Sequence, residues 1–343
     1  VLSFITPNSS GIVDLSVDGT ANRYIVYPVK GTYTFDLVQG NSKSSVGNVA
    51  SVEVLWETFN TTSAISVGDV IESVSLEGTK AKFSIPADAK PGNALIAAKN
   101  SGGTILWSWH IWLCDDIKEQ SYNNKVWLDR NLGALAAEAG NPLNIGFYYQ
   151  FGRKDPFRGA AAINANTYVA TTGTWPAVTA TIPAQPEAYA IANPQQLIAR
   201  NKDPRDWFTT DTATQNHALW NSGGKTMYDP CPLGYKVPGS YDWNVGQGAE
   251  TSFFTNSNLI FDSTTYCATY KSGDTVVVYP IAGCTSGAGE LSNVGVKGYY
   301  RATGNIETTK YGDVLELVLS GSVINPVQGN YRGSGYSVRC VKE

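Results

Sequence analysis

Six aspartates in this chain have the chemistry that acid–base catalysis would need. They fall in stretches typical of loops or strand ends: Asp129, Asp155, Asp203, Asp206, Asp211 and Asp229. Two carboxylates can cleave a glycosidic bond when they are held about 5–10 Å apart. No spacing among these aspartates fixes such a pair, and the nearby Arg130 and Arg153 predict structural ion pairs with Asp129 and Asp155. We therefore expect a protein that is not an enzyme.

Side chains that bind metals are scarce. The chain has 2 histidines, His110 and His217, and its cysteines form no C-x-x-C pair of the kind that zinc ribbons and thioredoxin-type sites need. A calcium site needs clustered carboxylate and amide oxygens. The tripeptide motifs Glu-Pro-Asn and Trp-Asn-Asp, which are typical of lectin-type calcium sites, do not occur. The sequence predicts no metal and no cofactor.

The 5 cysteines are Cys114, Cys231, Cys267, Cys284 and Cys340. In an exported protein four of them would most simply form two disulfides, and four cysteines allow three pairings. We favour Cys231–Cys340, which closes the second half of the chain, and Cys267–Cys284, which joins neighbouring strands. The alternative is that several of these cysteines are buried, reduced thiols. Cys114 is left over, and we expect it to be buried rather than nucleophilic.

Aromatic and amide side chains are the candidates for ligand binding. Four tryptophans of the second half lie in loop-like stretches, and three of them are candidates: Trp175, Trp207 and Trp220, with Trp243 as the fourth. A second set resembles the chemistry of antibody paratopes: Tyr300, Arg301, Asn330, Tyr331 and Arg332. Sugars stack on exposed rings, and protein interfaces are rich in Tyr, Trp and Arg. We expect these eight residues to line a recognition surface. The alternatives are that tryptophans such as Trp207 fill a core and that the second set is an ordinary polar segment.

Composition and charge narrow the class of protein. Among 343 residues, Lys and Arg number 25 and Asp and Glu number 29, which gives a net charge of −4 with no basic patch. This balance argues against nucleic-acid binding. No apolar run approaches the roughly 20 residues of a membrane-spanning helix. Charged residues make up only 16% of a chain rich in Tyr and Trp, which favours an extracellular, cell-surface location.

The elements that must position these residues divide the chain in two. Residues 1–114 contain runs that alternate apolar and polar side chains, at 31–38, 80–85 and 105–112. Such runs predict short strands, and turn signals between them favour an immunoglobulin-like β-sandwich. Residues 115–343 mix short strands and long loops. We expect short helices at 193–200 and after Ser240, and strands at 275–281, 314–319 and 336–341.

The run at residues 105–112 is apolar on both faces. Trp107 and Trp109 lie on one face, and His110 and Trp112 lie on the other. We expect this strand to be buried between its own core and the second half of the chain, which would make the interface between the two halves rigid. His110 is then an interface histidine whose polar atoms are satisfied.

Four blocks of the second half resemble the Fibrobacter succinogenes major paralogous domain, which occurs in surface proteins of Bacteroidetes. They are VWLDRNLGA at 126–134, FYYQFGRKDPF at 147–157, YDPCPLGYKVP at 228–238 and GYSVRCV at 335–341. The resemblance covers about residues 118–343. The chain differs from the family at residues 298–301, where the family usually has a Tyr-Trp-Ser motif. The first half, through residues 93–99 and 105–112, is similar to the β-sandwich that precedes this module in fimbria-like and lipoprotein sequences.

The resemblance implies a fold and a role. The fold is an α+β, C-type-lectin-like module of the branch that includes formylglycine-generating enzymes. The role is adhesion at the cell surface, as a fimbrial tip or similar subunit that binds a glycan or a surface protein. Other fimbrial subunits are implied partners. Two alternatives are a glycan-capture lipoprotein of a nutrient uptake system and a purely structural fimbrial subunit. Fold alone does not decide between these functions.

Overall fold

The protein is rich in β-strands. The computed structural model describes residues 11–164, 167–170, 179, 181–199, 202–221, 223–245, 251–304 and 311–343. Within these ranges α1 (Pro186–Ala192) is the one α-helix, and three short 3-10 helices accompany it: Pro142–Asn144, Thr212–Thr214 and His217–Leu219. No helix among the described residues is long and apolar enough to cross a membrane.

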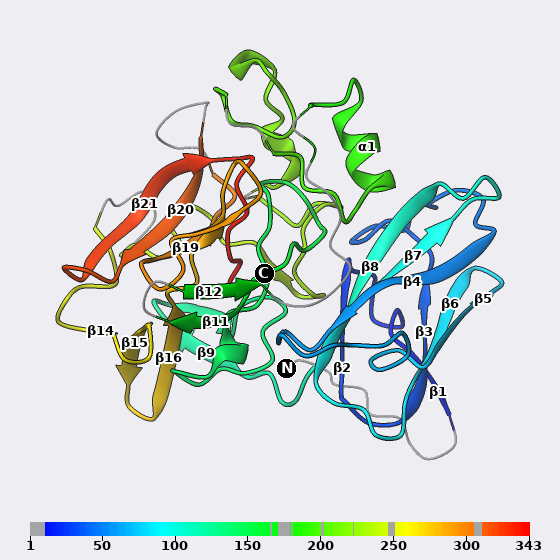
Figure 1. The fold of residues 1–343 in the computed structure, drawn as a ribbon, viewed down its shortest axis with the longest axis horizontal. Helices are drawn as coiled ribbons and strands as arrows, with labels where there is room; N and C mark the ends of the chain where they lie inside the picture. Colours follow the sequence, from blue (N-terminus) through cyan, green and yellow to red (C-terminus); the bar gives the residue numbers. More distant parts are fainter. Residues whose placement is uncertain are drawn as a thin grey trace.

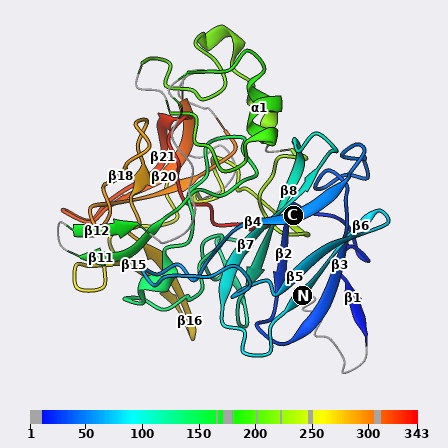
Figure 2. The same cartoon turned by 45° about the vertical axis from the view of Figure 1, so that its right-hand side comes forward.

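The first part of the chain forms two four-stranded sheets, drawn in blue and cyan in Figures 1 and 2. The first sheet has the order β1 (Ile12–Asp14), β3 (Gly31–Asp36), β6 (Lys80–Ile85) and β5 (Ser73–Glu77). The second has the order β2 (Arg23–Val26), β8 (Ile105–Leu113), β7 (Gly92–Lys99) and β4 (Ser51–Thr58). Phe35 and Phe83 from the first sheet share one apolar cluster with Ile96 and Trp109 from the second. The two sheets therefore enclose a common core.

Strand β8 is buried on both faces, as its sequence predicts. Trp107 and Trp109 lie in the core between the two sheets. Trp112 lies in a second cluster that includes Phe147 and Cys340 from the later part of the chain. This second cluster joins the two parts of the molecule through apolar contacts.

His110 on the same strand is fully buried beside the rings of Trp56 and Phe147. Its predicted place in the interface is confirmed. Neither of its ring nitrogens has a hydrogen-bond partner among the described residues, so the expectation that its polar atoms are satisfied is wrong. Packing against rings holds this histidine, and burial together with the charge of Arg23 lowers its pKa well below the ordinary value.

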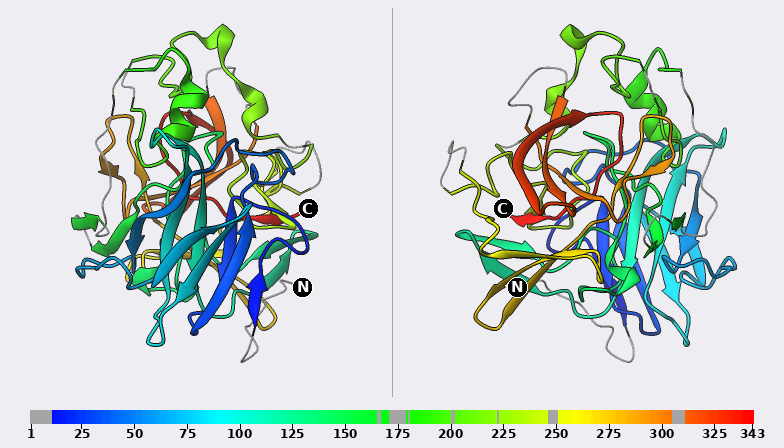
Figure 3. Two further views of the ribbon diagram at one scale, coloured as in Figure 1. Left: turned by 90° about the vertical axis from the view of Figure 1, so that its right-hand side faces the viewer. Right: turned by 60° about the vertical axis from the view of Figure 1, so that its left-hand side comes forward.

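The later part of the chain forms several small sheets joined by long loops, in green to red in Figure 3. A four-stranded sheet has the order β13 (Tyr235–Lys236), β22 (Val341–Lys342), β10 (Lys125–Leu128) and β9 (Glu119–Tyr122). Two antiparallel three-stranded sheets follow: β14 (Leu259–Asp262), β15 (Cys267–Ser272) and β16 (Thr275–Pro280), and β19 (Lys297–Arg301), β20 (Tyr311–Val318) and β21 (Val323–Tyr331). Two strand pairs complete the set: β11 (Ala160–Asn164) with β12 (Thr167–Ala170), and β17 (Cys284–Thr285) with β18 (Leu291–Ser292).

Both predicted helices differ from the structure. The helix begins at Pro186 and its C-cap is Asn193, so residues 193–199 are not helical. Asn193 precedes Pro194, and a residue before proline is disfavoured in the helical region. Ser240 caps no helix, since the described residues that follow it, 241–245, are not helical. Its hydroxyl donates to Asp313 Oδ2 instead. Of the expected strand at 336–341, only Val341–Lys342 is a strand, β22.

One of the two predicted disulfides is present. Cys231 and Cys340 are bonded, with their Cα atoms 6.0 Å apart. Cys267 and Cys284 are buried free thiols, so their predicted pairing is wrong. Cys267 begins β15 and its sulfur accepts from Asn144 Nδ2, whereas Cys284 packs in a different cluster with Tyr336 and its neighbours. Cys114 is a buried free thiol, as expected.

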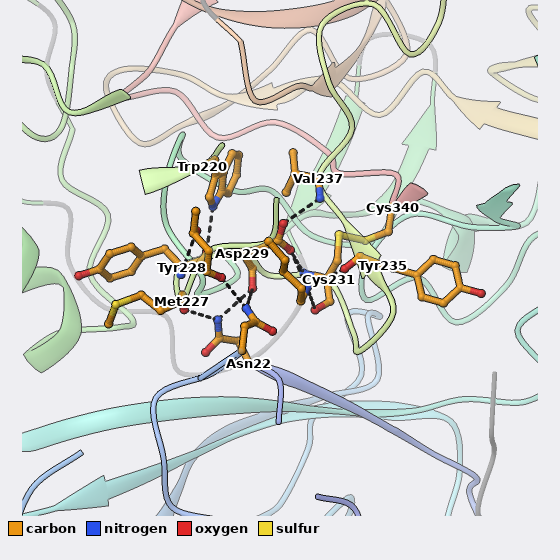
Figure 4. A network of polar contacts seen from close by, with 12 residues as sticks. Asn22, Trp220, Met227, Tyr228, Asp229, Cys231, Tyr235, Val237 and Cys340 are labelled. Atoms are coloured by element: carbon orange, nitrogen blue, oxygen red, sulfur yellow. Dashed lines mark hydrogen bonds and ion pairs between the residues drawn. A yellow bond between two sulfur atoms is a disulfide. The ribbon is translucent and has the colours of Figure 1, made fainter. Parts of the chain in front are cut away.

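The interface between the two parts of the chain is called the joint below. Asn22, which lies just before β2, makes hydrogen bonds on one side of it (Figure 4). Its Nδ2 donates to the carbonyl oxygens of Met227 at 2.7 Å and Asp229 at 2.9 Å. The Asp229 carboxylate accepts from the backbone N–H groups of Cys231 and Val237. This aspartate therefore orders the loop that receives Asn22.

Two more asparagines hold the other side of the joint. Asn60 Nδ2 and Asn93 Nδ2 both donate to the carbonyl oxygen of Gly133, at 2.7 and 3.0 Å. Gly133 has φ +79°, and a Cβ there would lie 2.1 Å from the Phe147 ring, so only glycine fits. Trp112 Nε1 donates to the neighbouring carbonyl of Ala134 at 3.1 Å. Apolar packing and directed hydrogen bonds together fix the joint.

Candidate functional site: a groove at the joint

A groove of about 910 Å³ lies beside this joint. One wall of the groove consists of the loop after β4 and the loop before β7, both in the first part of the chain. A second wall consists of the residues that lead into β9 and the residues that directly follow β10. The loop at 135–143 and strand β16 complete the lining. Its lining residues are Phe59, Thr61, Lys90, Pro91, Asp115, Asp116, Lys118, Gln120, Asp129, Arg130, Leu135, Ala136, Ala137, Glu138, Ala139, Asn141, Leu143, Val276 and Val278.

A buried ion pair between Asp129 and Arg130 lies in the groove wall. Arg130 donates from Nε and Nη2 to the two carboxylate oxygens of Asp129, at 2.7 and 2.8 Å. Nη2 also donates to the carbonyl oxygen of Asp116. Burial lowers the pKa of Arg130, but the hydrogen bonds and charge of Asp129 outweigh it and the pKa is raised. The guanidinium is therefore charged and held in one orientation.

Arg130 keeps one donor group free for a ligand. Its hydrogen bonds use Nε and Nη2, and Nη1 has no partner among the described residues. The side chain itself is only 8% exposed. A mostly buried guanidinium with one free nitrogen at a cavity wall can donate to an incoming oxygen without first losing much water or side-chain freedom.

Gln120 lines the groove from β9. Its Nε2 donates to the carbonyl oxygen of Val276 at 2.7 Å, and its Oε1 is shielded from solvent with no partner among the described residues. Lys118 lies two residues earlier and pairs with Asp129 across the ladder, since Asp129 N donates to Lys118 O. Lys118, Gln120, Asp129 and Arg130 all line the groove at this end of the β9–β10 hairpin.

The charges that line the groove nearly cancel. Lys90, Lys118 and Arg130 give +3, and the four acids Asp115, Asp116, Asp129 and Glu138 give −4, so the sum is −1. Asp129 is paired with Arg130, and Asp116 lies 3.8 Å from Lys118. Within the described ranges, no cluster of three or more His, Cys, Asp or Glu side chains could hold a metal ion. The arrangement is suited to binding a polar ligand of little net charge.

None of the predicted recognition residues that the structure describes lines this groove. Trp207 and Trp220 are buried, and their indole N–H groups donate to the carbonyl oxygens of Phe151 and Tyr228. They are core residues rather than exposed stacking platforms. For Trp207 the alternative interpretation is the correct one, and for Trp220 the expectation of a ligand-binding role at a recognition surface is wrong. Trp175 lies outside the described residues.

Three members of the second predicted set are also buried. Tyr300 donates to the carbonyl oxygen of Pro280, and Arg301 donates to the carbonyl oxygens of Tyr331 and Ser334. Arg332 forms a fully buried ion pair with Asp206, at 2.9 Å. Their predicted placement on a recognition surface is wrong, because polar atoms of all three side chains bind other groups of the same chain.

Asn330 and Tyr331 are only half-buried and remain accessible. The guanidinium of Arg205 lies 4.2 Å from the centre of the Tyr331 ring, and Tyr311 packs edge-on at 5.4 Å. Asn330 Oδ1 accepts from the hydroxyl of Tyr336. These two residues form a small aromatic and amide patch that lies apart from the groove-lining set.

The ion-pair prediction for the aspartates is right at one position and wrong at another. Asp129 pairs with Arg130 as expected. Asp155 pairs with Lys154 and not with Arg153. Lys154 Nζ also donates to the hydroxyl of Ser108, which in turn donates to Asp155. A serine beside a lysine can act as a nucleophile. Here Ser108, Lys154 and Asp155 are all buried, so their hydrogen bonds connect the two parts of the chain at the joint.

The sequence alone could not indicate the groove. Its lining comes from segments that are as far apart as Phe59 and Val278, and no local motif connects them. Lys118, Gln120 and Glu138 carry no signal of their own. The one usable signal was the adjacent Asp129 and Arg130, which lie within the first block of the family resemblance.

Comparisons with known proteins gave no relative. A scan against protein-family models, a search of curated proteins and a search of solved structures each found no match.

Proposed function

We propose that this chain is a non-catalytic recognition protein of a cell surface, which binds a glycan or a surface protein in the groove at its joint. The family resemblance of the four sequence blocks supports this role. The finer fold proposal is an immunoglobulin-like sandwich followed by a C-type-lectin-like module, and the two packed sheets of the first part are compatible with its first half.

The Arg130 side chain is the observation that carries this proposal. It lines the groove, it is nearly buried, and its ion pair with Asp129 leaves one nitrogen unpaired. Ligand sites are typically concave, with mostly apolar walls and a few polar groups in fixed positions. Phe59, Leu135 and Val278 supply apolar wall in the same cavity.

Two further features support a preformed site at an extracellular surface. The Cys231–Cys340 disulfide is of a kind that persists in oxidising compartments. The hydrogen bonds of Asn60 and Asn93 to Gly133 hold the two walls of the groove together. A rigid site loses less conformational entropy when the ligand binds.

An array of glycans, mucins and extracellular proteins, probed with the full chain, tests this proposal. We expect saturable binding to at least one member, equal in calcium and in chelator. Binding to no member would contradict the recognition role and favour a purely structural subunit. Loss of binding in chelator would contradict a metal-independent site.

A further inference from the structure

We infer that the ligand of the groove is a neutral oligosaccharide rather than an acidic glycan or a charged peptide. The inference rests on the proposed recognition function and specifies the chemistry of the same site. It depends on three properties of the groove: its hydrogen-bonding groups, its charge balance and the direction in which its apolar wall continues.

Arg130 Nη1 is an unpaired donor at the groove wall. The exposed carboxylates of Asp115, Asp116 and Glu138 are acceptors in the same lining. A sugar hydroxyl both donates and accepts, so a hydroxyl-rich ligand can pair with both kinds of group. A carboxylate or sulfate group can only accept, so it cannot pair with these carboxylates.

The charge balance disfavours a charged ligand. Asp115, Asp116 and Glu138 are exposed at the groove, and they oppose the approach of an anion. A cationic peptide meets Lys90 and Lys118 at the same groove, both of them exposed. Charges of both signs that are already solvated or paired contribute little net attraction to either kind of ion. A neutral ligand avoids both repulsions.

The apolar wall extends the groove along the outer face of the β14–β16 sheet. Val276 and Val278 are two residues apart on β16 and line the groove. Val278 pairs with Thr269, which pairs with Ile260, so these three side chains lie in one row across the sheet. Ile260 is 59% exposed and Val276 is 44% exposed. A chain of several sugar units can lay its apolar faces along this row.

Titration calorimetry with the full chain tests this inference. The probes are neutral hexose oligosaccharides of three to five units and the same chains carrying sulfate. We expect the neutral chains to bind at least tenfold more tightly than the sulfated ones. Val276→Arg places a large side chain on the groove wall, and Val323→Arg, at a valine that is 43% exposed on β21, is the matched control. We expect Val276→Arg to weaken binding at least tenfold and Val323→Arg to leave it unchanged, with equal melting temperatures.

The other outcomes would contradict the neutral-glycan assignment, the groove as the binding site, or the recognition function. Tighter binding of sulfated chains, or no binding of any neutral oligosaccharide while the array shows a protein or acidic ligand, refutes the neutral-glycan assignment and leaves the recognition role standing. Neutral binding that Val276→Arg does not change refutes the groove as its place. An array without any binder refutes the proposed function itself.

Discussion

Removing the Cys231–Cys340 disulfide should cost far more stability than removing the other buried cysteines of the second half. The bond joins residues 109 positions apart. In the chain-entropy description, closing a loop of that length stabilises the folded state by about 5 kcal/mol. Replacing two buried cysteines by alanine costs a further ~2 kcal/mol through lost packing.

The double variant Cys267→Ala, Cys284→Ala is the matched control, since these cysteines are as buried as the bonded pair but free. It should lose only the packing contribution. The difference between the two double variants, about 5 kcal/mol, is then the effect of the disulfide. Urea unfolding of both variants and of the parent chain measures it. If the disulfide variant does not fold, the parent chain with and without reductant gives the same comparison.

Thiol counting checks the connectivity independently. Alkylation of the parent chain in denaturant without reductant should modify three thiols, which are those of Cys114, Cys267 and Cys284. One modified thiol per chain, or equal destabilisation of the two double variants, would show that Cys267 and Cys284 are also bonded and would refute this part of the structure.

Three further predictions follow from buried polar groups. Arg332→Ala leaves Asp206 buried without its ion-pair partner and should lower the unfolding free energy by about 3–5 kcal/mol. The neighbouring variant Tyr331→Ala should lower it by only about 1 kcal/mol. Similar melting temperatures for the two variants would contradict this prediction. Asn93→Ala removes two hydrogen bonds at the joint and should cost about 2–3 kcal/mol in urea unfolding; an unchanged midpoint would show that the joint does not depend on it. Burial lowers the pKa of His110, so below pH 6.5 the unfolded chain binds a proton that the folded chain does not. Stability should fall by about 1.4 kcal/mol for each pH unit below 6.5, and the slope should be smaller in His110→Phe; equal slopes for the two chains would contradict it.

Alternation of apolar and polar residues located several strands well. The expected runs at 31–38, 80–85 and 105–112 correspond to β3, β6 and β8, because period-two patterns reflect one buried face. Burial of β8 on both sides followed from its apolar residues on both faces. The second half was harder, since its strands are short and its backbone is held by side-chain hydrogen bonds such as those of Asp229.

The candidate site was the least predictable part. Residue type suggested Arg301, Arg332, Trp207 and Trp220 as ligand-binding groups, but the same side chains that suit recognition also suit a core with many carbonyl oxygens to satisfy. Composition cannot separate these uses, because both need donors on large side chains. Only the structure shows that Arg130 combines near-complete burial with a free nitrogen at a cavity wall.

Hydrogen–deuterium exchange of the full chain, with and without the tightest neutral oligosaccharide from the panel, shows whether the ligand lies in the groove. We expect slower exchange in the groove segments, at residues 59–61, 115–120 and 135–143 and in β16, with no change at 328–332. Protection at 328–332 with no change in the groove would contradict it and would return the recognition surface to Asn330 and Tyr331.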